Sequence, residues 1–236
     1  MIYIFRVYQL LIAIPLCIVL TLLACIVTVI TCVLFNGRFW GYWPPKIWAM
    51  LFCWLNFVTV RVKGNDNIDK KTSYVFVANH QGAFDIFSIY GFLGHNFRWM
   101  MKESLRKIPF VGYTCYKAGH IFVNRTSTSA IRVSMEKAKK QLSNGMSLVV
   151  FPEGSRTRNG KMGAFKRGAF TLAAEFGLPL VPVTIDGSFK VMPRTAKLPR
   201  PGRITLTIHK PIEIAEGGNE LESLMEKSRE AIASAL

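Results

Sequence analysis

The stretch YVFVANHQGAFDIFSIYGFL, residues 74–93, contains a short apolar run, a polar turn and a second apolar run. Residues 74–78 are apolar throughout, which is typical of a strand with both faces covered. His80 follows this strand directly, and Asp85 lies in the first turn of a helix expected over 84–93. Because ligands bind at the carboxyl ends of the strands in open α/β sheets, His80 lies at a candidate site.

The remainder of the chain, from residue 61 onward, alternates short β-branched runs with helical patterns, which is the signature of an α/β sheet with helices packed on it. Further strands are expected at 120–124, 147–151, 180–185 and 203–209, and further helices at 128–143, 167–176 and 220–235. Residues 187–202 contain three prolines and are expected to form a long loop. A chain of 236 residues is long enough for one such domain with a short appendage, so we expect one core.

The chain is strongly basic, with 30 Lys and Arg against 14 Asp and Glu and a formal charge of +16. Residues 1–60 hold three basic residues and no acid, which leaves 27 basic and 14 acidic residues, or +13, on residues 61–236. Nucleic acid and an anionic membrane are the two natural partners of such a charge. No zinc-finger spacing, RNP-like run or basic helix followed by heptads is present. The apolar N-terminus therefore favours a membrane and an acidic lipid.

The N-terminal segment Gln9–Phe35 has 27 residues without a charge. As a helix it would cover roughly 40 Å, against about 30 Å for the hydrocarbon core of a bilayer, so one tilted transmembrane helix fits. A cleaved signal peptide is a poorer interpretation because its apolar region is normally shorter. A lipoprotein signal ending at Cys25 is also disfavoured, since residues 26–35 stay apolar.

An aromatic cluster follows at residues 39–43, and then a 14-residue apolar run at 47–60. Aromatic side chains of this kind favour the headgroup level of a membrane. A run of this length suits an interfacial or re-entrant helix better than a second span. The alternative is a buried helix followed by the first strand of the core, and length alone does not separate the two.

His80 and Asp85, both in the motif NHQGAFD, are the first residues that carry chemistry. A neutral imidazole can take a proton from an alcohol as the alcohol attacks, provided that a neighbour fixes its tautomer and stabilises the imidazolium. Asp85, folded back by the intervening turn, is placed for that role. The alternative is that Asp85 caps the helix while His80 is a satisfied polar residue at a strand end, and both arrangements are common.

The motif FPEGSR, residues 151–156, follows the strand expected at 147–151. Proline and glycine break the strand at its carboxyl end, which presents Glu153 and Arg156 on the same rim as His80. A guanidinium group there would bind a phosphate with two parallel hydrogen bonds. The motif thus predicts an anion-binding loop beside the histidine.

The motif GHIFVNR, residues 119–125, is a third strand that ends by presenting an arginine, Arg125. By itself Arg125 would more simply form a surface ion pair. Two strand-end arginines beside a His/Asp pair are better explained by a pocket for an anionic substrate. Lys102 and Lys166 are possible additional cations of this pocket.

A metal site is not expected. The other histidines lie in unrelated segments, and no H-E-x-x-H or C-x-x-C motif completes a ligand set. The five cysteines are at positions 17, 25, 32, 53 and 115. Four of them lie in apolar runs, where cysteine behaves as a small hydrophobic residue. They indicate a reduced, cytosol-facing protein without disulfides.

The motifs NHQGAFD, GHIFVNR and FPEGSR, followed by Val181–Ile185, resemble the four ordered motifs of the glycerolipid acyltransferase family. The resemblance is strongest to the bacterial 1-acyl-sn-glycerol-3-phosphate (lysophosphatidic acid) acyltransferases. The likeness spans about residues 60–212. H-x-x-x-x-D alone is a weak signal, but its order with G-x-x-F-x-x-R, F-P-E-G-x-R and V-P-V is highly specific. Gly82-Ala83, Asn124 and Ser155 differ from the residues common in the family, and none of them removes a catalytic group.

The resemblance implies a mixed α/β sheet with helices on both faces, similar to glycerol-3-phosphate acyltransferase. It implies an acyltransferase domain over 61–236, after a membrane-anchoring helical segment over 1–60. It further implies that His80 and Asp85 form the catalytic dyad and that the strand Val181–Ile185 helps to shape an acyl pocket. The implied glycerol phosphate ligands are Arg125, Glu153, Gly154, Ser155 and Arg156.

The implied reaction is direct transfer of a fatty acyl group from acyl-CoA or acyl carrier protein to the sn-2 hydroxyl of 1-acylglycerol 3-phosphate, giving phosphatidic acid without a cofactor. The absence of G-x-S-x-G argues against a lipase. Expected partners are membrane lipids, lysophosphatidic acid and the acyl donor, and not nucleic acid. The expected location is the bacterial inner membrane, with the catalytic domain facing the cytoplasm. A different acceptor, such as glycerol 3-phosphate or a lyso-amino-acid lipid, and a non-catalytic module that binds anionic lipid remain alternatives.

Overall fold

The computed structural model describes residues 2–123, 133, 136, 142, 145–214 and 221–236. The helices and helical turns are α1 (Ile2–Tyr8), the π-helical turn η1 (Gln9–Ala13), α2 (Ile14–Leu34), α3 (Gly37–Trp40), α4 (Trp43–Leu55), η2 (Asn65–Asn67), α5 (Phe84–Phe92), η3 (Glu103–Lys107), α6 (Val111–Lys117), α8 (Gly168–Phe176), α9 (Ser188–Val191) and α10 (Leu221–Ala233). The strands are β1 (Val58–Lys63), β2 (Val75–Ala78), β3 (Phe97–Lys102), β4 (Ile121–Val123), β5 (Ser147–Val150), β6 (Leu180–Asp186) and β7 (Gly202–Ile208).

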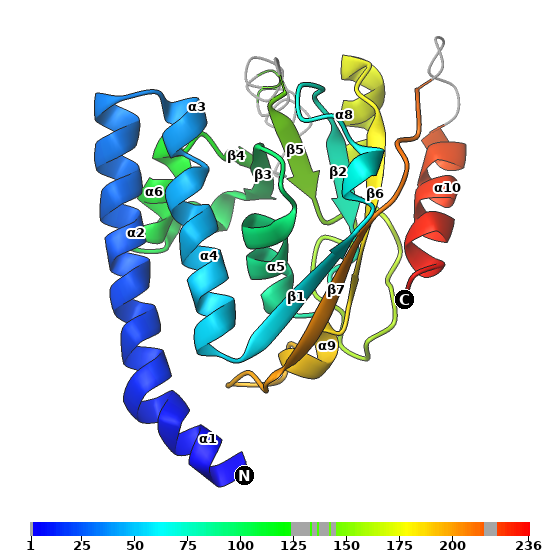
Figure 1. Ribbon diagram of the computed structural model, residues 1–236. Helices are drawn as coiled ribbons and strands as arrows, with labels where there is room; N and C mark the ends of the chain where they lie inside the picture. Colours follow the sequence, from blue (N-terminus) through cyan, green and yellow to red (C-terminus); the bar gives the residue numbers. More distant parts are fainter. Residues whose placement is uncertain (1, 124–132, 134–135, 137–141, 143–144, 215–220) are drawn as a thin grey trace.

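Within the described residues, seven strands form one sheet in the order β1-β7-β6-β2-β5-β3-β4 (Figure 1). The strands from β6 to β4 are parallel to one another. Strand β7 is antiparallel to β6 and parallel to β1. Because β2, β5 and β3 are adjacent and parallel, the residues that follow them meet at one edge of the sheet.

Each face of the sheet has its own hydrophobic core. Along β2, Phe76 and Ala78 belong to the core on the side of α4 and α5, whereas Val75 and Val77 belong to the core on the side of α8 and α10. All four side chains are fully buried. Burial on both faces is the reason why this strand is apolar at every position. The expected mixed sheet with helices on both faces is confirmed.

The N-terminal segment forms a helix from Tyr3 to Leu34 that is long and apolar enough to cross a membrane. Its π-helical turn, η1, comes just before Pro15, which lies in the first turn of α2. Proline has no backbone N–H to give to the preceding turn, and a wider turn accommodates this loss. Large apolar side chains along the helix are exposed, which fits a lipid-facing surface.

Both ends of this N-terminal helix are hydrogen-bonded to the part of the chain that contains the sheet. Near the start, Arg6 Nη1 and Gln9 Nε2 donate to the carbonyl oxygen of Pro199, at 2.9 and 3.0 Å. Just beyond the end, Arg98 Nη2 donates to the carbonyl oxygen of Gly37 at 2.9 Å. Between these points α2 packs against α4 and α6. The helix therefore lies along the domain (Figure 1).

The apolar run at 47–60 forms most of α4 and the start of β1. Helix α4 packs on α5 and α2, and its Ala49 and Cys53 are fully buried. The run is therefore a helix and the first strand of the core, which was the second of the two interpretations. A division of the chain at residue 60 falls inside β1, and it stays a prediction.

The strands expected at 74–78, 120–124, 147–151, 180–185 and 203–209 are confirmed as β2, β4, β5, β6 and β7. The helices expected at 84–93, 167–176 and 220–235 are confirmed as α5, α8 and α10. The structure adds β3 and α6, which were not expected, and α9 within the expected loop. The helix expected at 128–143 falls largely outside the described residues.

Candidate active site

The loop between β2 and α5 brings His80 and Asp85 together. His80 Nδ1 lies 2.7 Å from Oδ2 of Asp85. Asp85 is fully buried in the first turn of α5, whereas 14% of the His80 side chain is exposed. The imidazole thus has a carboxylate on one nitrogen and leaves the other, Nε2, for a substrate.

Backbone groups hold the Asp85 carboxylate in place. Its Oδ2 atom also accepts the backbone N–H groups of Gln81, at 2.7 Å, and Gly82, at 2.9 Å. A side chain at Gly82 would place Cβ 2.5 Å from the carbonyl oxygen of Ser188, so this tight turn requires glycine. With a carboxylate at Nδ1, the neutral imidazole carries its proton there, and Nε2 keeps the lone pair that a general base needs.

Glu153 fastens the loop after β5 to the backbone of the histidine. Its Oε1 atom accepts the N–H of His80 at 2.7 Å, and Oε2 accepts the N–H of Gly163 at 2.7 Å. Burial raises the pKa of this carboxyl, and the two N–H donors oppose the rise. These contacts make Glu153 a positioning residue for His80, and its implied role in binding glycerol phosphate stays a prediction.

The other residues predicted on this loop pass beside the dyad. The backbone N–H of Thr157 donates to the carbonyl oxygen of His80 at 2.9 Å, which holds the loop next to the histidine. Gly154 lines the cavity beside His80. Ser155 is exposed, and Arg156 is half-buried. The FPEGSR motif and the dyad therefore share one rim, as the sequence predicted.

The further candidate cations differ in their placement. Lys102 is exposed at the carboxyl end of β3 and lines the same cavity as His80. Lys166 is exposed, and its backbone N–H bonds to the carbonyl oxygen of Pro152 at 2.9 Å. Arg125 lies outside the described residues.

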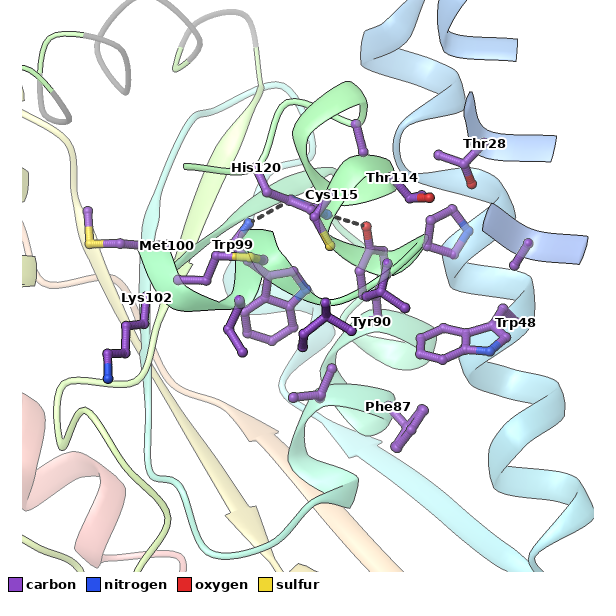
Figure 2. Close-up of a pocket in the computed structure, with 18 of the residues that line it drawn as sticks. Thr28, Trp48, Phe87, Tyr90, Trp99, Met100, Lys102, Thr114, Cys115 and His120 are labelled. Atoms are coloured by element: carbon purple, nitrogen blue, oxygen red, sulfur yellow. Dashed lines mark hydrogen bonds between the residues drawn. The ribbon is translucent and has the colours of Figure 1, made fainter. Parts of the chain in front are cut away.

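An apolar cavity of about 440 Å³ opens beside His80 and runs between the sheet and helices α2, α5 and α6. Figure 2 shows Lys102 at one end of the view and Thr28 and Trp48 at the other, with Trp99, Tyr90 and Cys115 between them. Its size lies within the range of about 300–1,000 Å³ usual for ligand pockets. Strand β6, which the resemblance assigned to an acyl pocket, contributes none of the described lining residues.

Aromatic rings and an amide support the dyad, and sequence reasoning did not single them out. Phe151 stacks on His80 with ring centroids 3.9 Å apart and planes 9° apart. Trp99 in turn stacks on Phe151, with ring centroids 5.4 Å apart. Asn79, just before the histidine, bonds through Nδ2 and Oδ1 to the backbone of Ile185 at 2.9 and 2.8 Å. The only signal for them in the sequence is their position, because Asn79 directly precedes His80 and Phe151 lies two residues before Glu153.

A buried hydrogen-bond chain closes the cavity beyond the aromatic stack. The backbone N–H of Trp99 donates to His120 Nδ1 at 3.1 Å, so His120 carries its proton on Nε2, 3.2 Å from the Tyr90 hydroxyl (Figure 2). The hydroxyl in turn donates to the carbonyl oxygen of Gly41 at 3.3 Å. Burial, with a smaller contribution from the charge of Arg98, lowers the pKa of His120 to about 3.

The site thus combines an imidazole paired with a buried carboxylate, an apolar cavity and cationic side chains near the ends of parallel strands. A family model described as Acyltransferase matches residues 59–186, which is more than half of the chain. The chain belongs to this acyltransferase family.

The relatives within the family narrow the comparison. The 1-acyl-sn-glycerol-3-phosphate acyltransferase of Chlamydomonas reinhardtii is 34% identical over 185 residues, which is 76% of this chain and 54% of that protein. A protein of the same name from Borreliella burgdorferi is 38% identical over 133 residues, which is 56% of this chain and 53% of that protein. This chain spans about half the length of the curated relatives it matches.

A solved structure covers almost the whole chain. The 1-acyl-sn-glycerophosphate (LPA) acyltransferase PlsC from Thermotoga maritima matches with a TM-score of 0.74 and 28% identity. The match covers 95% of this chain and 96% of that one, so it includes most of the N-terminal helical segment.

Proposed function

We propose that the protein transfers a fatty acyl group from an acyl thioester to the sn-2 hydroxyl of 1-acylglycerol 3-phosphate, forming phosphatidic acid. The observation that carries the proposal is the His80–Asp85 bond at the mouth of the apolar cavity. The relatives that carry the name of this activity support the choice of acceptor.

The proposed reaction needs no covalent enzyme intermediate. His80 Nε2 takes the proton of the acceptor hydroxyl as its oxygen attacks the thioester carbonyl, and Asp85 stabilises the imidazolium that forms. The carbon–sulfur bond then breaks, and the leaving thiolate takes the proton back from the imidazolium. The acyl chain lies in the cavity, whose lining is mostly apolar, and the reacting carbonyl lies beside His80.

The phosphate of the acceptor binds at the polar end of the rim. Lys102 ends β3 and Arg156 lies in the loop after β5, the two strands that follow β2 on one side of the dyad, and the part of the chain that the structure describes contains no ion pair for either. A guanidinium group binds phosphate with two parallel hydrogen bonds. Arg125 is proposed as a further ligand on the motif resemblance alone.

The acyl donor is acyl-CoA or acyl carrier protein, since both present the same thioester to the base. The proposed location is the cytoplasmic face of a bacterial inner membrane. Both ends of the N-terminal helix contact the catalytic part of the chain, which supports a helix that enters and leaves the membrane on the side of the domain. This favours a re-entrant arrangement, with the N-terminus on the same side of the membrane as the domain, over a single span that would place them on opposite sides.

The first test is replacement of the base. His80→Ala removes general-base catalysis, so product formation should fall by about 10²–10⁴-fold, while binding of lysophosphatidic acid stays close to that of the unaltered protein. His209→Gln is the matched control, because His209 bonds to Thr184, away from the cavity. Full activity in His80→Ala would overturn the proposal.

The second test concerns the phosphate. Arg156→Ala should raise the KM for lysophosphatidic acid by about tenfold or more, because hydrogen bonds to charged groups contribute about 1.5–3 kcal/mol. The same change should leave the KM for monoacylglycerol, which lacks the phosphate, almost unaltered. Equal losses for both acceptors would reject the phosphate role.

A further inference from the structure

The loop between β5 and α8 begins with the FPEGSR motif and later reaches helix α10. Along it, the backbone N–H of Gly163 donates to Oε2 of Glu153 at 2.7 Å, and Oε1 of the same carboxylate accepts the N–H of His80 at 2.7 Å. A side chain at Gly163 would bring Cβ to 3.0 Å from Oε2, which would crowd the carboxylate. Gly163 is therefore the residue through which the later part of the loop holds the carboxylate that positions His80.

Arg229 of α10 binds the backbone on both sides of Gly163. Its Nη1 atom donates to the carbonyl oxygen of Gly163 at 2.6 Å, and its Nη2 atom donates to the carbonyl oxygen of Met162 at 3.5 Å. The guanidinium also lies over the ring of Phe165, 5.6 Å from its centroid. In the part of the chain that the structure describes, no ion pair joins Arg229 to a carboxylate. Its hydrogen bonds are therefore directed to the backbone of this one loop.

The two carbonyl contacts fix a residue that is free to rotate. The carbonyl oxygens belong to the peptide groups before and after the Cα atom of Gly163, and each peptide group is planar. Glycine has more backbone freedom than any other residue, so holding both planes sets its φ and ψ angles. The N–H that Glu153 accepts is in the first plane and points away from the Met162 carbonyl oxygen. Arg229 and Glu153 therefore bind opposite sides of one peptide group, and their opposite charges polarise it in the same direction.

Arg229 lies far from the motifs in the sequence. It belongs to α10, which packs on β6 and α8 (Figure 1), and the family model ends at residue 186. Two other ties between this loop and the dyad start from residues in or next to the motifs. Gln81 Nε2 donates to the carbonyl oxygen of Gly160 at 3.1 Å. The N–H of Thr157 donates to the carbonyl oxygen of His80 at 2.9 Å. Arg229 is the contribution of the C-terminal helix.

We propose that Arg229 is a positioning residue for the dyad, which acts through Gly163 and Glu153 on the backbone of His80. The inference rests on the acyl transfer proposed above. The guanidinium keeps the Gly163 N–H directed at Glu153, and Glu153 keeps the histidine where its Nε2 atom meets the acceptor hydroxyl. Helix α10 thereby aligns the base, although it does not line the described part of the cavity.

The test variant is Arg229→Ala, since alanine favours the helix, and Arg229→Lys is the conservative change. Glu222→Ala is the matched control, because it removes the ion pair between α10 and Arg167 and leaves the loop contacts intact. For each protein, kcat and KM are measured with lysophosphatidic acid, with and without added ethylguanidinium. Hydrogen exchange of the backbone amides is followed by mass spectrometry, and this second measurement does not depend on turnover.

In Arg229→Ala, kcat should fall about tenfold with little change in KM, because a displaced base slows the chemistry more than it weakens binding. Peptides that contain the amides of His80 and Gly163 should exchange these amides about tenfold faster. Arg229→Lys should retain, and ethylguanidinium should restore, part of the lost kcat. Glu222→Ala should show none of these changes.

An unchanged kcat, or unchanged exchange at His80, would overturn the proposal. Equal losses in Arg229→Ala and Glu222→Ala would also overturn it, since they would indicate an effect of α10 docking alone. An unaltered protein that transfers no acyl group would instead overturn the proposed function. The amide exchange would then still decide whether Arg229 holds the backbone of His80.

Discussion

Replacing Asp85 with asparagine separates the charge of the dyad from its shape. The amide oxygen can take the place of Oδ2 and keep the N–H groups of Gln81 and Gly82 as donors. The amide NH₂ then takes the place of Oδ1, for which no hydrogen-bond partner is found among the described residues. The loop should keep its conformation, and the negative charge behind His80 is lost.

The size of the effect follows from the geometry. Nδ1 and Oδ2 are 2.7 Å apart, and the carboxylate is fully buried. With charge centres about 4 Å apart and an effective permittivity of about 20, the attraction between imidazolium and carboxylate is about 4 kcal/mol. The imidazolium forms only as the reaction proceeds, so this loss falls on the transition state and lowers kcat by about 1,000-fold.

The assay is the initial rate of thiol release at saturating acyl donor and lysophosphatidic acid, with KM determined for each. We expect kcat to fall and both KM values to change little, because the uncharged variant still binds the substrates. Asp186→Asn, at the exposed end of β6, is the matched control. A loss of less than tenfold in a variant that melts at the unaltered temperature would refute the role given to Asp85.

Three further changes test other parts of the site. Glu153→Gln leaves the backbone N–H of either His80 or Gly163 facing an NH₂ group, so the free energy of unfolding in denaturant should fall by about 1–3 kcal/mol. An unchanged value would contradict the role of Glu153 in positioning His80. The fold lowers the pKa of His120 to about 3, from an ordinary value of about 6.5. Below pH 6.5 the unfolded chain therefore binds a proton that the folded chain does not, so the free energy of unfolding decreases as the pH is lowered. From pH 7 to pH 5 the free energy of unfolding should decrease by about 2 kcal/mol more in the unaltered protein than in His120→Gln, measured by the same denaturation. Equal decreases in the two proteins would contradict the low pKa of His120. Cys115→Phe narrows the cavity, so in competition between acyl donors the preference should shift by about tenfold against the longest acyl chains. Cys115→Ser should leave this preference unchanged. Identical product profiles for the two variants would contradict binding of the acyl chain in this cavity.

The central site could be predicted because its parts are close together in the sequence. The apolar run of β2 leads straight into His80, and five residues later Asp85 opens α5. The strand β5 leads in the same way into Glu153. Parallel neighbouring strands then bring both motifs to one edge. What the motif could not tell is that the carboxylate of Glu153 faces backbone N–H groups.

Strand β3 and the cavity could not be predicted, for a different physical reason. Arg98 places a charge inside β3, which breaks the apolar pattern of a buried strand. Its partners are carbonyl oxygens of Gly37 and Arg38, some 60 positions away along the chain. The cavity likewise depends on α2, β3, α5 and α6, which approach one another only after folding. Pairings between distant segments leave no local signal.

The hydrogen bonds at both ends of the N-terminal helix have a mechanical consequence. A membrane anchor joined by a linker lets an enzyme swing above the lipid surface, so its opening samples many heights and angles. Here Arg6 at one end and Arg98 at the other attach the helix to the body of the enzyme. The cavity therefore keeps a fixed position relative to the helix, and in the proposed reaction an acceptor that diffuses within the membrane would meet His80 at a constant height.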